Sequence, residues 1–349
     1  MVGFTVLAAP AFAFALACLG TRVLIGVLTR RAVLDRPNER SSHTAPVPRG
    51  GGLAVVAAIA VGWVWLLAAD AEAGRWLAPL SVALALAALS FVDDLRSLGA
   101  GVRLGAQALA VAVGLWALDG HGALAAFAPA WIDLPLTALG WLWFVNLYNF
   151  MDGIDGITGT ETVSIGLGLA GLAVLGIAPA AVLGPALVLV AAAAGFMVWN
   201  WHPARIFLGD VGSVPLGYLL GLLLVVVAGG EGEGEGGGGA TVAGGLVAAL
   251  LLPLVYLVDA TLTLGRRLAR GENPARAHRE HVYQRAVIAG ASHSAVCLRI
   301  AAANLVLVGL ACFLAPAAPL VALAAGAVAV AVLFAALRPA PVPTSARRT

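Results

Sequence analysis

Apolar runs of roughly membrane-spanning length recur along the whole chain and decide what it can fold into. An α-helix needs about 20 residues to cross the hydrocarbon core of a bilayer. We place about eleven such segments at residues 3–28, 51–69, 76–92, 104–118, 133–151, 160–178, 180–199, 213–229, 240–264, 296–314 and 317–337. Only 11% of the residues are charged, whereas soluble domains carry about a quarter. We therefore predict an all-α, polytopic membrane bundle that forms a single domain over residues 1–349.

The arginines indicate which way this bundle faces. The chain contains no lysine, and Arg75 is the one arginine in a connection on the first side of the membrane. The second side receives residues 29–50, 93–103, 152–159, 200–212, 265–295 and the tail 338–349. Positive charge accumulates in cytoplasmic loops. We therefore predict an N-terminus outside, a C-terminus in the cytoplasm, and every polar motif at the cytoplasmic face.

Composition excludes several other readings. The net charge of +2 is too small to indicate nucleic-acid binding. Three cysteines, without ligand spacing and inside or beside apolar runs, indicate core residues rather than a disulfide framework. Arginines follow the first apolar run rather than precede it, which favours an uncleaved helix over a signal peptide. The Gly–Glu run 231–239 and the Pro-rich tail 338–349 are predicted to be disordered.

Polar side chains interrupt the end of the fifth apolar segment. Asn146, Asn149, Asp152 and Asp155 recur at intervals of three residues. On a helix this spacing places neighbouring members on one face, so amides and carboxylates converge where the segment meets water. We predict that this cluster is the centre of a functional site.

Two other segment boundaries carry carboxylates. Asp93 and Asp94 end the third segment; such a pair can hold Mg²⁺ or take a proton from a phosphate, or it is a solvated helix end neutralised by Arg96. Asp210 lies in the sequence Phe-Leu-Gly-Asp-Val-Gly-Ser, whose glycines let the backbone approach a ligand closely. The alternative is a glycine-assisted turn back into the membrane.

Basic groups supply the complementary charge. His278 and His281 lie in the longest inner loop among several arginines, including Arg279. Zinc would need further ligands that the loop lacks, so we favour a clamp for a diphosphate; the alternative is a basic loop attracted to anionic lipid. The loop 35–52 ends at a helix N-terminus, which favours anions.

Four residues receive no role from the sequence. His121, His202 and His293 have no ligand-like context and are expected to be incidental. Asp259 lies inside the ninth apolar segment, where it is either part of a buried polar pair or a functional group.

In this order the motifs resemble those of the polyprenyl-phosphate N-acetylhexosamine-1-phosphate transferases, glycosyl transferase family 4. Five motifs between Asp35 and Gln284 carry the resemblance: Asp-x-Pro-x-x-Arg-x-x-His with Pro-Arg-Gly-Gly-Gly, Asp-Asp-Leu-Arg with Arg-Leu-x-x-Gln, Asn-x-x-Asn-x-x-Asp-Gly-Ile-Asp-Gly, Phe-Leu-Gly-Asp-x-Gly-Ser, and His-x-x-His-x-Tyr-Gln. The chain lacks the triple histidine and the Thr-Pro-Thr-Met-Gly-Gly loop of the peptidoglycan branch. This difference favours the O-antigen or cell-wall initiating type.

The resemblance implies a reaction and a set of roles. A sugar 1-phosphate would pass from a UDP-N-acetylhexosamine to undecaprenyl phosphate with release of UMP, assisted by Mg²⁺, for which Mn²⁺ can substitute. The implied roles are Asp210 as metal ligand, Asp93, Asp94 and Asp152 as catalytic carboxylates, and Asn149, Asp155, Phe207, His278, Arg279 and His281 as donor contacts. Asp155 and Phe207 would face the uracil, and Asp152 would also lie beside the nucleotide.

Other expectations complete this hypothesis. An ionised lipid phosphate is already a competent nucleophile, so we predict direct attack rather than a covalent enzyme intermediate. The enzyme would lie in the inner (cytoplasmic) membrane. A homodimer is compatible with the sequence but is not predicted by it. The runner-up is a transporter, which would place ionisable groups near mid-membrane rather than at one boundary. A purely structural scaffold would leave the carboxylates unexplained.

Overall fold

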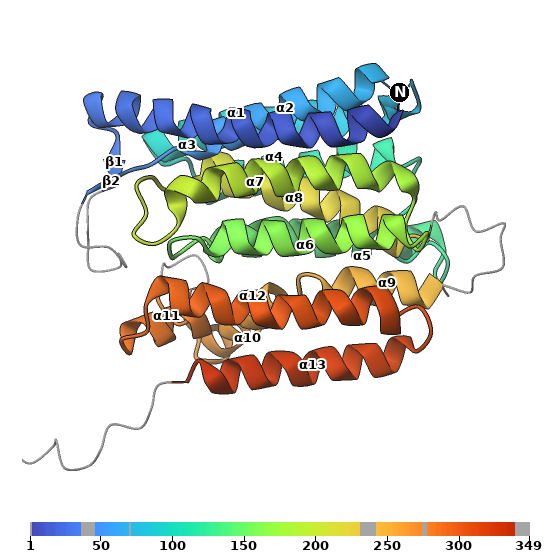
Figure 1. Ribbon diagram of the computed structural model, residues 1–349. Coiled ribbons are helices and arrows are strands. Elements are labelled where there is room, and N and C mark those ends of the chain that lie inside the picture. Colours follow the sequence, from blue (N-terminus) through green and yellow to red (C-terminus); the bar gives the residue numbers. More distant parts are fainter. Residues whose placement is uncertain (1, 36–45, 70, 231–241, 274–277, 339–349) are drawn as a thin grey trace, which may run out of the picture.

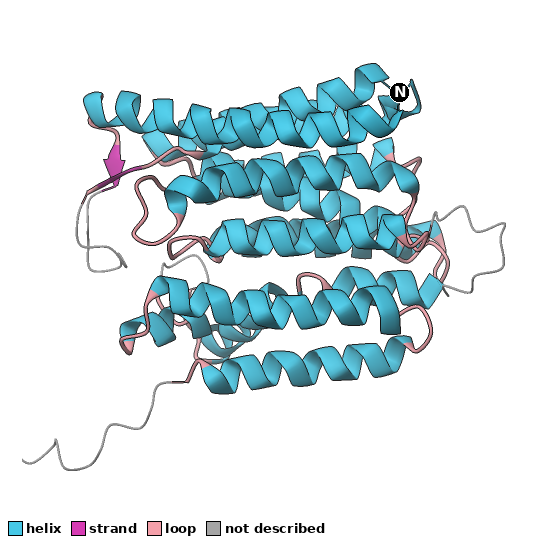
Figure 2. Ribbon diagram, in the orientation of Figure 1, coloured by secondary structure: helices cyan, strands magenta, loops and turns pink. Residues whose placement is uncertain are grey.

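The computed structural model describes residues 2–35, 46–69, 71–230, 242–273 and 278–338. Within them the chain is helical except for one short strand pair, and the long helices lie side by side (Figures 1 and 2). The helices are α1 (Val2–Arg30), α2 (Gly52–Ala69), α3 (Leu77–Arg96), α4 (Ala100–Ala117), α5 (Ala130–Phe150), α6 (Ile157–Val174), α7 (Leu183–Asn200), α8 (Asp210–Ala228), α9 (Val242–Leu251), α10 (Leu254–Ala269), α11 (Val282–Ile288), α12 (His293–Gly309) and α13 (Pro319–Ala336).

Short elements connect these helices. Strands β1 (Leu34–Asp35) and β2 (Val47–Pro48) pair antiparallel. The single-turn elements are η1 (Ala71–Trp76), η2 (Ala180–Val182) and η3 (Leu310–Leu314). The expectations for Pro37, Arg40 and His43, for the run 231–239 and for most of the tail lie outside the described residues.

The prediction of about 11 membrane spans is confirmed. In the described part of the chain, ten helices are long and apolar enough to cross a membrane, and the bent pair α9–α10 makes up to eleven. An isolated run of this length and composition is stable only where lipid or protein covers it. The protein is therefore a multi-pass membrane protein.

The expected span 240–264 is bent rather than one continuous helix. The chain breaks between α9 and α10 and turns by 68°. Pro253 lies at the break, where it cannot donate a backbone hydrogen bond to the preceding turn. Helix α10 then continues to Ala269 and carries the buried Asp259 on its inner side.

Helix α8 forms the centre of the bundle. All 18 residues from Val211 to Ala228 are buried, as expected for a helix that is apolar on every side. Gly217 and Gly221 allow this packing, because a Cβ at either position would collide with Tyr148 or Trp141 of α5. The first residue of α8 is Asp210, so the most buried of the candidate membrane helices carries the predicted metal ligand.

The predicted polar segments gather at one end of the bundle. In Figure 1 the β1–β2 pair, the connection from α7 to α8, and α11 lie at the same end, on the left, and α13 also ends there. Helix α1 begins at the opposite end. The loops that carry the sequence motifs therefore lie at the same end of the bundle.

Candidate active site

The Pro-Arg-Gly-Gly-Gly segment is hydrogen-bonded to the Phe-Leu-Gly-Asp segment. Phe207 N–H donates to the Pro48 carbonyl, and the Gly50 and Gly51 amides both donate to the Phe207 carbonyl. Arg49 and Phe207 form an isolated parallel bridge. Two motifs about 160 residues apart in sequence therefore form one backbone unit.

Glycine at position 52 is what allows the two segments to lie so close. The Gly52 amide donates to the Leu208 carbonyl at 2.9 Å. A Cβ on Gly52 would overlap the backbone N and Cα of Gly212, which no rotamer change can relieve. The glycine run thus serves close backbone packing beside the site.

Arg49 lies between two carboxylates that come from different helices. Its Nη2 is 2.7 Å from Asp94 Oδ1 and 2.8 Å from Asp210 Oδ1. The Val211 amide donates to Asp94 Oδ2 at 3.3 Å. The alternative was a helix end neutralised by Arg96, but the structure pairs Asp94 with Arg49, which joins the ends of α3 and α8.

The other Asp210 oxygen faces α5. Asn149 Nδ2 donates to Asp210 Oδ2 at 3.3 Å, and Ser213 Oγ donates to Asn149 Oδ1 at 2.6 Å. The predicted Asn149 and Asp210 are thus in direct contact. Ser213 orients the Asn149 amide so that its NH₂ group points at the carboxylate.

Asp93 faces a different neighbour from Asp94. Its Oδ1 accepts the Leu98 amide at 2.5 Å, and its Oδ2 lies 3.2 Å from Arg103 Nη1. Arg103 belongs to α4, whose Gln107 accepts a hydrogen bond from Asn146 at 2.8 Å. The adjacent carboxylates therefore have separate partners, which sequence alone could not distinguish.

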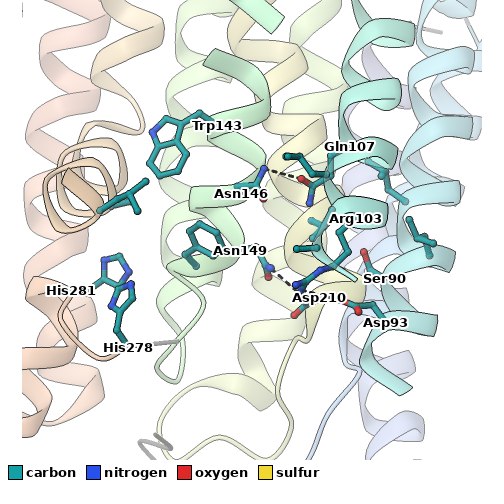
Figure 3. Close-up of a pocket in the computed structure, with 18 of the residues that line it drawn as sticks. Ser90, Asp93, Arg103, Gln107, Trp143, Asn146, Asn149, Asp210, His278 and His281 are labelled. Atoms are coloured by element: carbon teal, nitrogen blue, oxygen red, sulfur yellow. Dashed lines mark hydrogen bonds and ion pairs between the residues drawn. The ribbon is translucent and has the colours of Figure 1, made fainter. Parts of the chain in front are cut away.

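A pocket of about 440 Å³ opens where these helix ends meet. Figure 3 shows His278 and His281 on the side opposite Asp93 and Arg103, with Asn149 and Asp210 between them. Apolar side chains also line it, namely Leu86, Leu89, Leu104, Trp143, Phe150 and Leu264. One pocket thus combines charged and polar groups with an apolar surface.

Five predicted residues lie outside the pocket lining. They are Asp94, Asp152, Asp155, Phe207 and Arg279. Asp94 is connected to the pocket through Arg49 and Asp210. Phe207 is connected through its backbone bridge to Arg49.

Asp152 is largely buried beneath the site. Burial raises the pKa of its carboxyl to about 6, the hydrogen bond from Thr158 opposes this rise, and the nearby charge of Asp210 adds to it. Thr158 Oγ1 donates to Asp152 Oδ1 at 2.6 Å. Burial thus moves the Asp152 pKa toward neutral.

Asp155 is held by two histidines that were expected to be incidental, and that expectation is wrong. His202 Nδ1 lies 2.7 Å and His293 Nδ1 3.2 Å from Asp155 Oδ2. Burial alone would raise the Asp155 pKa, but the interactions with these two histidines and the hydrogen bond from Ala204 N–H lower it. Because His202 and His293 are far from Asp155 in the sequence, no local sequence pattern predicts these contacts.

The ligand atoms of Asp155, His202 and His293 lie within 4.8 Å of one another, close enough to share a metal ion. However, the Ala204 amide donates to the same Asp155 oxygen, and the Asp155 amide donates to His293 Nδ1. These hydrogen bonds occupy one acceptor site of Asp155 Oδ2 and the Nδ1 lone pair of His293. We interpret the cluster as a brace between three segments.

Two arginines of the inner loop are committed to acidic partners. Arg267 is buried and its Nε lies 2.9 Å from Glu272 Oε2. Arg270 pairs with Glu272 at 2.6 Å and also with Glu280. A diphosphate clamp built from this loop therefore draws on His278 and His281 rather than on these two arginines.

The carboxylates around Arg49 fit a hard cation such as Mg²⁺. Asp94 Oδ1 is buried and, although it contacts Arg49, makes no well-directed hydrogen bond. Oxygen ligands from Asp94 and Asp210 are the type that Mg²⁺ prefers. The guanidinium between them shows that this place already favours positive charge.

Fold and site together define a membrane-embedded enzyme with carboxylates, histidines and an apolar surface around one pocket. The model of glycosyl transferase family 4 matches residues 76–228. The Desulforudis audaxviator phospho-N-acetylmuramoyl-pentapeptide-transferase is 32% identical over 260 residues, 63% of this chain and 76% of that protein. The chain belongs to glycosyl transferase family 4, as its motifs predict.

Two further relatives carry names of another branch. "Probable undecaprenyl-phosphate N-acetylglucosaminyl 1-phosphate transferase" of Bacillus subtilis is 28% identical over 295 residues, 80% of this chain and 78% of that protein. "Decaprenyl-phosphate N-acetylglucosaminephosphotransferase" of Mycolicibacterium smegmatis is 29% identical over 294 residues, 76% of this chain and 71% of that protein.

Proposed function

We propose that the protein transfers N-acetylglucosamine 1-phosphate from UDP-N-acetylglucosamine to a polyprenyl phosphate, releases UMP, and so begins a lipid-linked glycan. Family membership and the two relatives named for N-acetylglucosamine support this substrate. The observation that carries the proposal is the pocket in which Asp93, Asn149, Asp210 and His281 surround one space with an apolar flank. A transporter is the disfavoured alternative.

The division of roles follows from the separate partners of the carboxylates. Asp94 and Asp210 would hold Mg²⁺, which when bound neutralises charge on the donor diphosphate. Asp93 and Arg103 face the pocket and would receive the lipid phosphate, with Arg103 orienting it and Asp93 accepting its proton. His278 and His281, on the opposite side, would bind the diphosphate. The uracil roles of Asp155 and Phe207 rest on the family resemblance, because both residues lie outside the pocket lining.

The pocket also favours direct transfer. Phosphoryl transfer needs positioning and charge neutralisation more than covalent participation by the protein. A lipid phosphate bound beside Arg103 and a diphosphate bound beside His281 would approach each other across Asn149 and Asp210. We propose a single displacement in which the lipid phosphate oxygen attacks the donor β-phosphorus of the sugar 1-phosphate group and UMP leaves.

Purified protein in lipid should form a lipid-linked product only when UDP-N-acetylglucosamine, undecaprenyl phosphate and Mg²⁺ are all present. Thin-layer chromatography of labelled product, with a parallel release of UMP, measures this. As controls, the donor is replaced by UDP-N-acetylmuramoyl-pentapeptide or by UDP-glucose. Both should give little product. Formation of product from the pentapeptide donor alone would reject the proposed substrate.

We also propose that the site faces the cytoplasm, in the cytoplasmic membrane, because the arginines gather on that side. Reporter fusions after Arg96, Arg205 and His281 should all report a cytoplasmic location. A fusion after Arg75 is the control and should report the outside. An outside signal at two of the three site loops would contradict this orientation.

A further inference from the structure

Asp259 is a buried carboxylate to which the proposed reaction gives no role. It lies in α10, six residues after the break at Pro253, and its side chain is 2% exposed. Thr263 Oγ1 donates to its Oδ1 at 3.1 Å, and the Val282 amide is 3.0 Å from both oxygens. His281 Nδ1 lies 3.2 Å from Oδ1.

These contacts join α10 to the start of α11, next to the ion pair of Arg270 with Glu280. A carboxylate inside a membrane protein is costly unless donors surround it. Here one donor belongs to α10 itself, and the others come from the start of α11, where exposed helix amides favour negative charge. The carboxylate therefore fixes the first turn of α11 against the bent helix.

Helix α11 carries part of the pocket wall. His281 and Gln284 line the pocket. On the neighbouring side, Tyr283 and Gln284 pack against Gly153 so closely that a Cβ there would collide with the Tyr283 hydroxyl. A displaced α11 would thus disturb both the pocket and the loop that carries Asp152.

The His281 ring is held from several directions. It stacks against Tyr283 with a centroid distance of 5.7 Å and lies 5.0 Å from the His278 ring. Because its Nδ1 faces Asp259, the ring nitrogen directed away from the carboxylate is Nε2. The His281 side chain also accepts a hydrogen bond from the Gln284 backbone amide in the first turn of α11, so the ring is tied to α11 as well as to Asp259.

We infer that Asp259 is a positioning residue for the donor side of the pocket, acting through His281 and the first turn of α11. The inference rests on the proposed function, since it assigns His281 to the donor diphosphate. It gives a purpose to a charge that lies within the membrane-spanning part of the chain. It also explains why the bend between α9 and α10 lies next to the site: α10 brings the carboxylate to the start of α11.

A double-mutant cycle tests the inference. Asp259→Asn keeps the size of the side chain and one acceptor for the Val282 amide but removes the charge facing His281. We expect the KM for UDP-N-acetylglucosamine to rise about tenfold, the scale of a lost charge-assisted hydrogen bond, with the KM for undecaprenyl phosphate unchanged. His281→Gln should have a similar effect, and the double variant should be no worse than His281→Gln alone.

The controls separate a positioning role from a loss of structure. Thr263→Val removes another donor to the same carboxylate without touching the His281 contact, and should keep a KM near that of the wild type. Effects of Asp259→Asn and His281→Gln that simply multiply, or an unchanged KM in Asp259→Asn, would overturn the inference. If Asp259→Asn does not fold, Asp259→Glu replaces it in the cycle, since it moves the carboxylate by one methylene. The same test applies: its effect on KM should not add to that of His281→Gln.

Failure of the proposed function would look different. Wild-type protein that forms no lipid-linked product would reject the transferase assignment, whatever the variants do. In that case, the thermal shift caused by UDP-N-acetylglucosamine in the four proteins of the cycle measures the same coupling without turnover. If the two single variants and the double variant all lose the same amount of thermal shift, the positioning role is supported. If the losses of the two single variants add up in the double variant, it is rejected.

Discussion

Replacement of Asp210 by Asn should lower turnover at least about a hundredfold, the scale on which electrostatic groups act in transition states. The carboxylate lies at the start of α8 and shares Arg49 with Asp94. Asparagine has nearly the same shape but no charge, so a hard cation loses one of its two anionic ligands. The Mg²⁺ concentration needed for half-maximal activity should rise as well.

The protein itself should still fold. Asp210 is partly exposed, and an asparagine oxygen can still accept from Arg49. Asp119→Asn is the matched control, because Asp119 is exposed in the connection between α4 and α5 and has a positive φ that asparagine tolerates. Near-normal turnover and Mg²⁺ dependence in folded Asp210→Asn would remove this residue from the metal role.

The sequence was sufficient to predict the helices and the convergence of several polar residues. Apolar length is a local property, so the spans were predictable to within a few residues at most ends. Asp93, Asn149, Asp210 and His281 do line one pocket. Their motifs lie at the ends of apolar segments or in the loops between them, and the alternation of loops between the two membrane faces puts these positions on one side.

Pairings between distant segments were not predictable. Nothing near Arg49 in the sequence indicates that it would lie between Asp94 and Asp210. The contacts of His202 and His293 with Asp155 also join segments far apart in the chain. Such pairings depend on how the helices pack.

The bend between α9 and α10 shows a second limit of prediction from the sequence. Mean hydropathy over 240–264 is high on both sides of Pro253, so an apolar window cannot distinguish a straight span from a bent one. A proline signal was present, but prolines also occur inside α1, α5 and α8, which continue through them. Whether a proline ends a helix depends on what packs around it.

The second large effect is expected from the smallest side-chain change, Gly52→Ala. The three atoms nearest to a Cβ at this position are backbone atoms, the N and Cα of Gly212 and the carbonyl carbon of Val211, so moving a side chain cannot relieve the overlap. The first turns of α2 and α8 would have to separate. Overpacking of this kind costs about 1–3 kcal/mol and occasionally more, and we expect the upper part of that range.

Activity should fall further than stability. The same separation would pull Arg49 away from Asp94 and Asp210 and would break the hydrogen bonds from Gly50 and Gly51 to Phe207. Displacements of about 1 Å from reactive geometry can cost a hundredfold in rate. We therefore expect a lowered Tm together with a loss of turnover of about that size or more.

Gly140→Ala provides the matched comparison. Gly140 lies within α5, and a Cβ there would meet nothing within 4 Å. Alanine also has the higher helix propensity, so this variant should be at least as stable as the wild type and fully active. Thermal unfolding and initial rates of the two variants, measured in the same lipid, give the comparison. A Gly52→Ala protein with the Tm and turnover of Gly140→Ala would show that the contact between α2 and α8 does not hold Arg49 in place.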